Sequence, residues 1–328
     1  MKTLADYIIK GNGDIWPLIL PAHLTDGTGL MNPSVLVIED KVVVNLRHVN
    51  YTFFHSEAKL FQHPWGPLTY IHPENDMHLR TTNWWCELDN DYAIKRYTKI
   101  DTSKFDTYEP QWDFVGLEDA RLVVWDEKVY ITGVRRDTTT NGQGRMELSQ
   151  LSISDDSITE VSRLRIPPPN NPNSYCEKNW MPILDLPYHY VKWTNPTEVV
   201  VVDPHSQTSK TIHLGNQIAL SRDLRGGSQV ITLDDCYVTL THEVDLFNSE
   251  VGRKDALYRH RFVVWDKSWN FVSITKDFSI MGAHVEFAVG MCIHGDDILI
   301  TFGYQDNAAF ILKTSIQVLR NFIDENKI

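Results

Sequence analysis

The sequence predicts an all-β protein, a five-bladed β-propeller with short helical segments at its N- and C-termini. Three observations support this. Pairs of strands rich in β-branched and aromatic residues recur along the chain and are joined by tight acidic turns. Five of these pairs show the same order of features, as repeats of one structural unit do. Helical periodicity is confined to the two ends of the chain. We therefore expect residues 1–328 to form a single propeller domain.

Each of the five pairs follows the same plan. Polar or charged residues open the first strand, an acidic turn follows after about eight residues, and the second strand ends in a polar functional group. The five repeat-opening hairpins are expected near residues 32–47, 118–135, 177–192, 225–242 and 286–306.

The second hairpin shows this plan most clearly. Glu118 and Asp119 open a strongly apolar strand, the segment Asp126-Glu127-Lys128 forms the turn, and the returning strand ends in Arg135 and Arg136. The hairpin therefore carries charges of both signs at its open end.

Further strands complete each repeat. We expect residues 145–153 to pair with 158–164, residues 197–202 with 211–218, and residues 257–265 with 271–274. Two hairpins per repeat give a four-stranded blade. A two-sheet sandwich is the structural alternative.

Residues 51–112 and the two chain ends are less regular. Residues 51–112 are expected to supply outer strands of the first blade and loops over one face. Helices are expected at residues 3–9 and 315–325. The histidines of the irregular segment have no spacing typical of metal ligands, and we interpret them as loop residues: His55, His63, His72 and His78.

Composition restricts the class of protein. The chain is 42% hydrophobic, which is enough for a large core. Its net charge of −12 argues against nucleic acid as the main partner, because phosphate contacts dominate that affinity. Local basic pockets for a phosphate or a sugar phosphate remain compatible with this charge.

The cysteines and the N-terminus indicate a cytoplasmic protein. The four cysteines lie far apart without a Cys-x-x-Cys pair, so we expect no metal site, and free thiols suit a reducing compartment. The N-terminal segment lacks the apolar core of a signal peptide, and no stretch approaches the roughly 20 apolar residues of a membrane span. We expect neither a membrane nor a nucleic-acid partner, and a homo-oligomer remains open.

In a propeller the inner strands run along a central channel, so the polar ends of the five hairpins should converge on a funnel. The convergent residues are Asn32, Ser34, Glu118, Asp119, Lys178, Asn179, residues 225–228 and Glu286, with Arg47, Arg135, His242 and Asp306 from the neighbouring strands. Such hydrogen-bonding groups suit a sugar, and the cations suit phosphate. The alternative interpretation is a set of polar caps and salt bridges between blades.

The second hairpin opens with two neighbouring carboxylates. On a regular strand Glu118 and Asp119 face opposite sides, so only one should point into the funnel. Arg121 shares the side of Asp119 and should lower the pKa of that carboxyl group. A simple buried acid is then disfavoured, and a proton on Asp119 must be held by a neighbour or relayed through substrate. Gly-x-Ser-x-Gly, Walker and dinucleotide-binding motifs do not occur.

Several motifs resemble one family. They are Met31–Ser34 with Leu46-Arg47, Gly116–Arg121, Tyr237–His242, Tyr258–Asp266 and Leu299–Asp306. They are similar, in the same order, to motifs of the β-mannoside phosphorylases, which include the mannosylglucose and β-1,2-mannobiose phosphorylases. Related β-1,2-mannosyltransferases share the fold. The resemblance covers roughly residues 30 to 315.

The resemblance implies a five-bladed propeller and an inverting reaction in which inorganic phosphate attacks the anomeric carbon of a β-mannoside. It implies that Asp119 is the general acid and that its proton reaches the glycosidic oxygen through a sugar hydroxyl. Substrate would contact Asn32, Arg47, Glu118, Arg121, Glu286 and Asp306. Phosphate would contact Arg135, Arg136, Arg145, Lys178 and His242. No cofactor is expected beyond inorganic phosphate as co-substrate.

The sequence departs from the family pattern at Ala120, where those enzymes usually have proline, and in residues 177–180 and 224–228. These departures leave other reactions open. A mannosyltransferase could use a nucleotide sugar or a sugar phosphate, and a propeller could bind sugar without catalysis. A hydrolase would need a second carboxylate to activate water, for which Glu286 is the candidate. In each case the partner is an oligosaccharide or a sugar phosphate.

Overall fold

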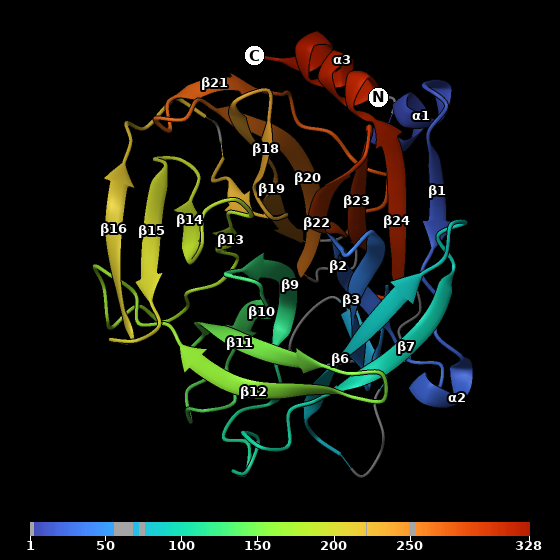
Figure 1. Cartoon of the computed structure of the whole chain (residues 1–328), viewed down its shortest axis with the longest axis vertical. Helices are drawn as coiled ribbons and strands as arrows, with labels where there is room; N and C mark the ends of the chain where they lie inside the picture. Colours follow the sequence, from blue (N-terminus) through green and yellow to red (C-terminus); the bar gives the residue numbers. More distant parts are fainter. Residues whose placement is uncertain (1–2, 56–67, 72–75, 221, 249–253) are drawn as a thin grey trace.

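The computed structural model describes residues 3–55, 68–71, 76–220, 222–248 and 254–328. Within these residues the chain consists mainly of strands, with three helices: α1 (Leu4–Lys10), α2 (Ala22–Thr25) and α3 (Ile316–Asn326). The all-β class and both terminal helices are therefore confirmed. Figure 1 shows the sheets arranged around a common centre, with α1 and α3 together at one edge.

The first two repeats form one continuous sheet. The first repeat contains β2 (Leu30–Ile38), β3 (Lys41–Val49), β6 (Leu79–Leu88) and β7 (Ile94–Asp101). The second contains β9 (Glu118–Trp125), β10 (Lys128–Arg135), β11 (Arg145–Ile153) and β12 (Ile158–Arg165). A short parallel pairing of β12 with β7 joins them, and β8 (Phe114–Val115) pairs with β6.

The remaining described strands form three larger sheets and one ribbon. One sheet contains β13 (Met181–Pro182), β14 (His189–Trp193), β15 (Glu198–Asp203) and β16 (Thr208–Leu214). The next contains β17 (Arg225–Gly226), β18 (Ile231–Leu233), β19 (Cys236–Asn248), β20 (Lys254–Trp265) and β21 (Phe271–Ile274). The last contains β22 (Glu286–His294), β23 (Asp297–Tyr304), β24 (Ala308–Ser315) and β1 (Asp14–Pro17). The ribbon is β4 (Thr52–His55) with β5 (Leu68–Ile71).

All five predicted hairpins and the three further strand pairs are present. The strand expected at residues 211–218 lies at Thr208–Leu214, because the backbone leaves the sheet after Leu214. Residues 51–112 supply β6 and β7 as expected. His63 and His72 lie outside the described residues, and so does the side chain of His55.

The two ends of the chain close the last sheet, which the sequence did not predict. Strand β1 pairs antiparallel with β24, from Asp14 opposite Lys313 to Pro17 opposite Phe310. Figure 1 shows this N-terminal strand beside the C-terminal strand. Strand β1 thus occupies the outermost position of its sheet, which the last strand of the second hairpin occupies in the other repeats.

Gln229 links strands of two sheets at the centre. Its buried amide nitrogen, Nε2, donates to the main-chain oxygens of Val35 (2.9 Å) and Leu122 (3.0 Å). Its Oε1 accepts from the main-chain N–H of Met291 (2.9 Å). One side chain thereby holds β2, β9 and β22 together next to the polar residues that open these strands.

Left-handed backbone recurs where the first three repeats open. The φ angles are +46° at Asn32, +51° at Asp119 and +59° at Asn179. Asparagine and aspartate tolerate this conformation better than other non-glycine residues. At Asn32 and Asp119 the strand register shifts, as at a β-bulge. Strict alternation of side chains therefore fails at the residues that face the centre.

No helix in the described part of the chain is long and apolar enough to cross a membrane.

Candidate functional site

Three carboxylates surround Arg47 where the first strands of the repeats begin. They form the carboxylate cluster: Glu118, Asp119 and Asp306. Arg47 on β3 donates through Nη1 to Asp119 Oδ1 at 2.8 Å, and its Nη2 lies 3.4 Å from Glu118 Oε2. The guanidinium is buried, but the surrounding carboxylates raise the pKa of Arg47 and keep it charged.

Asp119 and Glu118 have different electrostatic environments. Burial opposes ionisation of Asp119, but Arg47 and a 2.8 Å hydrogen bond from Asn32 Nδ2 outweigh it and lower its pKa. Burial raises the pKa of Glu118 despite the same arginine. Asp119 is therefore the more readily ionised of the two carboxyl groups.

The prediction that only one of these two carboxylates faces the funnel is wrong. Both contact Arg47 and are similarly accessible, with side-chain exposures of 16% for Glu118 and 17% for Asp119. The cause is the left-handed backbone at Asp119, which places the two side chains on the same side of the strand.

Asp306 completes the carboxylate cluster from the turn between β23 and β24. Burial raises its pKa to about 6, and the negative charges of Asp119 and Glu118 add to this effect while Arg47 opposes it. Three carboxyl groups thus interact with one guanidinium, and the pKa of Asp306 is raised whereas that of Asp119 is lowered.

Three cations and one histidine lie beside these carboxylates. Together they form the cationic cluster: Arg121, Lys178, Arg225 and His242. His242 is buried on β19, and its ring stacks on Tyr258 with centroids 5.6 Å apart. Burial, followed by His260 and the three cations of the cluster, holds the pKa of His242 well below its usual value. His242 is therefore neutral, and its buried Nδ1 has no hydrogen-bond partner among the described residues.

Arg121 contacts the main chain and not the neighbouring carboxylate. Its Nε donates to Gly227 O at 2.7 Å, and its Nη1 donates to Asp119 O at 2.8 Å. Burial lowers the pKa of Arg121 to about 10. Its charge still lowers the pKa of Asp119, as expected from the sequence, and its buried Nη2 finds no hydrogen-bond acceptor in the described residues.

Lys178 and Arg225 supply cations for which the described residues provide no carboxylate partner. Lys178 is exposed, Arg225 is half-buried, and neither forms an ion pair or side-chain hydrogen bond within the described ranges. Both line a cavity of about 320 Å³ together with Asn179 and Gly226. Arg225 was not in the expected phosphate-binding set, although residues 225–228 were expected to converge on the funnel.

Two predicted phosphate ligands are engaged elsewhere. Arg135 is buried among carboxylates, with Nε 2.8 Å from Glu147 Oε2 and Nη1 3.2 Å from Asp106 Oδ1. Arg145 donates to the main-chain oxygens of residues 144, 172 and 174. These contacts leave both guanidinium groups committed to the fold and do not support the expected role.

Arg136 lies at the edge of the carboxylate cluster. Its Nε is 4.0 Å from Glu118 Oε1, and its Nη2 donates to Cys176 Sγ at 3.0 Å. It is therefore placed to contact a ligand beside Glu118.

Glu286 was expected to bind substrate, and its contacts do not fit that role. Its fully buried carboxylate accepts main-chain N–H groups from Ile280 (2.6 Å), Met281 (2.7 Å) and Ala283 (3.0 Å). These bonds fix residues 280–283, so the carboxylate cannot activate water for a hydrolase either.

Among the described residues, no group of three or more His, Cys, Asp or Glu side chains is arranged to hold a metal ion.

Comparisons with known proteins show a shared fold. No family model matches the sequence, and no curated protein matches it. A β-1,2-mannobiose phosphorylase from Listeria innocua, in complex with β-1,2-mannobiose, matches 99% of this chain and 97% of its own at TM-score 0.56 and 12% identity. A glycosyl hydrolase from Bacteroides ovatus matches 88% and 85% at TM-score 0.57 and 13% identity.

A mannose phosphorylase from Leishmania mexicana, in complex with phosphate, matches 99% of this chain and 95% of its own at TM-score 0.52 and 12% identity. At these identities the likeness shows the fold alone. The expectation that this chain has the fold of β-mannoside phosphorylases is confirmed.

Replacing Glu286 by alanine should destabilise the protein by at least about 3 kcal/mol, because three buried N–H groups lose a charged acceptor. Urea unfolding checks this, with the exposed Glu109→Ala as the matched control. Unchanged stability together with weaker sugar binding would instead support the substrate-binding role expected from the sequence.

Replacing Asp306 by asparagine should stabilise the protein at pH 7–8. The folded state raises the pKa of Asp306 to about 6 from its ordinary value of 3.8, so ionisation above this range disfavours folding. The difference from the natural protein should shrink as pH falls through 6 and vanish below about 4. Free energies of unfolding from pH 3.5 to 8 check this, and a pH-independent difference would contradict it.

Proposed function

We propose that this chain is an inverting glycoside phosphorylase that transfers a β-linked mannosyl or similar hexosyl unit from an oligosaccharide to inorganic phosphate. The product is a sugar 1-phosphate, and the reverse reaction is synthesis. The observation that carries this proposal is the contact between two unlike clusters. Carboxylates suited to sugar hydroxyls adjoin cations that have no ion-pair partner in the described part of the chain, and the charges of Lys178 and Arg121 act on Asp119.

We infer further that the sheets are the five blades of one propeller. Five repeat-opening hairpins each begin a sheet segment of about four strands, and β1 supplies the last outer strand. The first two blades are then linked at their outer edges by the short β7–β12 pairing.

The sugar would bind against the carboxylate cluster. Charged carboxylates accept strong hydrogen bonds from hydroxyl groups, while Arg47 and Arg136 supply donors from the same side. The conformation of Asn32 is fixed by its bond to Asp119, so both side chains are preorganised before substrate arrives. The transferred ring would therefore lie next to Asp119.

Phosphate would bind in the cationic cluster. Lys178 and Arg225 supply free positive charge, and Arg121 Nη2 supplies an unused donor. Neutral His242 can donate through a protonated nitrogen without adding charge. The nucleophile would then approach from the Lys178 side, with the sugar held against Asp119.

In the proposed reaction a phosphate oxygen forms a bond to the anomeric carbon as the bond to the glycosidic oxygen breaks. Asp119 transfers a proton through a sugar hydroxyl to the departing oxygen. The low pKa of Asp119 in the free protein suits a base in the synthetic direction. For phosphorolysis, bound phosphate offsets the charges of Arg121 and Lys178, two of the cations that lower this pKa, and its negative charge favours the protonated acid.

A transferase reaction is the second candidate, and one observation favours it. The cavity of about 320 Å³ beside Lys178 and Arg225 leaves room for a group attached to the phosphate, such as the nucleoside of a nucleotide sugar. Release of free nucleotide during transfer would identify this activity.

Replacing Asp119 by asparagine should lower the rate of phosphorolysis by about 10²–10⁴-fold, because the group that carries the proton is lost. The assay is release of mannose 1-phosphate from β-mannosides and phosphate. Asp156→Asn, at an exposed turn, is the matched control. No sugar phosphate from any β-mannoside with the natural protein, and none consumed in reverse, would reject phosphorolysis.

Replacing Lys178 or Arg225 by methionine should raise the KM for phosphate by about 10–100-fold, because one charge-assisted hydrogen bond is lost. Affinity for the sugar should change little. Steady-state kinetics with varied phosphate check this, with the exposed Lys210→Met as control. An unchanged KM for phosphate in both variants would place the anion elsewhere.

A further inference from the structure

A second cavity lies far from the carboxylate and cationic clusters. It has a volume of about 540 Å³ and lies between strands β10–β12 and the turn from β15 to β16. Asp126, at its rim, follows the end of β9, whereas Asp119 lies at the start of that strand. Seven residues at about 3.3 Å each separate them by roughly 23 Å. One disaccharide therefore cannot occupy both places.

Tyr188 at the rim of this cavity has unusual backbone. Its φ angle is +62°, and a bulky residue rarely adopts this conformation. It directly precedes β14. The residues that directly precede the second strand in the other four hairpins are all acidic: Asp40, Glu127, Asp235 and Asp296. The left-handed φ itself recurs at Asp40, Glu127 and Asp235. This repeat differs in placing a bulky tyrosine in that conformation, which suggests a local function.

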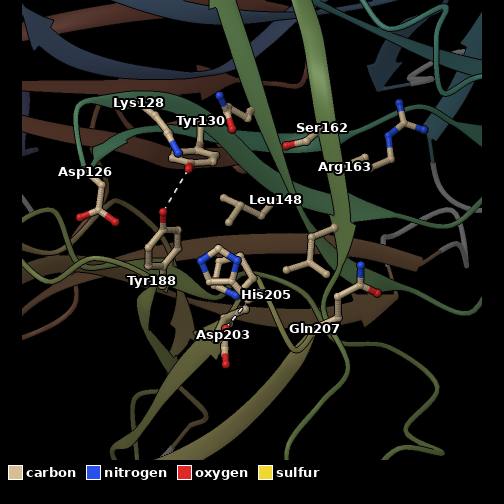
Figure 2. Close-up of a pocket in the computed structure, with 14 residues that line it drawn as sticks. Asp126, Lys128, Tyr130, Leu148, Ser162, Arg163, Tyr188, Asp203, His205 and Gln207 are labelled. Carbon is tan, nitrogen blue, oxygen red and sulfur yellow. Dashed lines mark hydrogen bonds between the residues drawn. The ribbon is translucent and has the colours of Figure 1, made fainter.

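Tyr188 links two sheets at the cavity. Its hydroxyl lies 3.1 Å from that of Tyr130 on β10, and its ring packs on Trp125 with centroids 5.4 Å apart. Burial, Tyr130 and Asp126 raise the pKa of Tyr188, so it remains a neutral phenol. Figure 2 shows the two hydroxyls meeting at one side of the hollow.

The lining combines hydrogen-bonding groups with an apolar floor. Figure 2 shows Lys128, Asp203, His205 and Gln207 around the hollow, with Leu148 between them. Carboxylate, amide, imidazole and ammonium groups provide both donors and acceptors. An apolar floor matches the C–H face of a sugar ring, so the lining suits a polyhydroxylated ligand.

The charges argue against an anionic ligand. Asp126 and Asp203 oppose the single exposed cation Lys128. The guanidinium of Arg163 is already paired with Glu160 (2.6 Å) and Asp106 (2.7 Å). Unlike the cationic cluster, this cavity therefore offers no excess of free positive charge.

We propose that this cavity is a non-catalytic binding site for a neutral oligosaccharide, separate from the site at Asp119. Tyr188 and Tyr130 donate and accept through their hydroxyls, and the opposite wall contributes His205. The ligand is a distant stretch of a long glycan or a second molecule, because the separation exceeds the length of a disaccharide. The site does not depend on phosphorolysis at Asp119.

Titration of the full chain carrying Asp119→Asn with manno-, gluco- and xylo-tetraose tests the proposal by calorimetry and by chemical shifts. At least one tetraose should bind. Tyr188→Phe, which keeps the ring, and His205→Ala, at an exposed turn, should each weaken that binding by roughly 3–10-fold, since each removes one hydrogen bond. Tyr97→Phe, at an exposed tyrosine of β7, should leave it unchanged.

Binding to no tetraose, or binding that both cavity variants leave unchanged, would overturn the proposal. Binding without any phosphorolysis by the natural protein would retain this site while rejecting the function proposed for Asp119. The two inferences therefore fail independently.

Discussion

The amide of Gln229 is the contact on which the centre of this protein depends. It hydrogen-bonds the main chains of β2, β9 and β22. Two of these strands open with Asn32 and Asp119, so the relative position of these residues depends on the Gln229 amide as well as on their own hydrogen bond. Ser34 adds a similar link, because its hydroxyl donates to Ala120 O and accepts from Leu122 N. Buried polar bonds between strands of different repeats thus hold the strands of the site in place.

The left-handed backbone at Asp119 then determines where the two carboxyl groups of the site lie. A regular strand would separate Glu118 from Asp119, whereas the bulge brings both to Arg47. The two carboxyl groups consequently compete for one guanidinium, and the additional bond from Asn32 favours ionised Asp119. Backbone geometry at one residue therefore brings neighbouring carboxyl groups to one arginine with opposite pKa shifts, as the proposed division between a proton-transferring group and a sugar-binding group requires.

Local patterns allowed much of the fold to be predicted, because alternating apolar residues and acidic turns are visible within each hairpin. The pairing of β1 with β24 leaves no such signal, since a strand of four residues meets its partner across almost the whole chain. The site was predicted less well for the same reason. Arg135 and Arg225 are equally basic in the sequence. Asp106 and Glu147, from separate segments, neutralise the first, whereas no described carboxylate reaches the second.

The free cations matter because the chain is strongly acidic overall, with a net charge of −12. In such a protein, carboxylates are available to neutralise most arginines, as happens at Arg135. Among the described residues, Lys178 and Arg225 nevertheless remain unpaired beside a buried donor of Arg121 that lacks an acceptor. An unsatisfied buried donor costs about 1–3 kcal/mol, and like charges repel. A bound anion would remove both penalties, so the cluster is more stable occupied than empty. Phosphate would thus complete the site electrostatically before it takes part in the reaction.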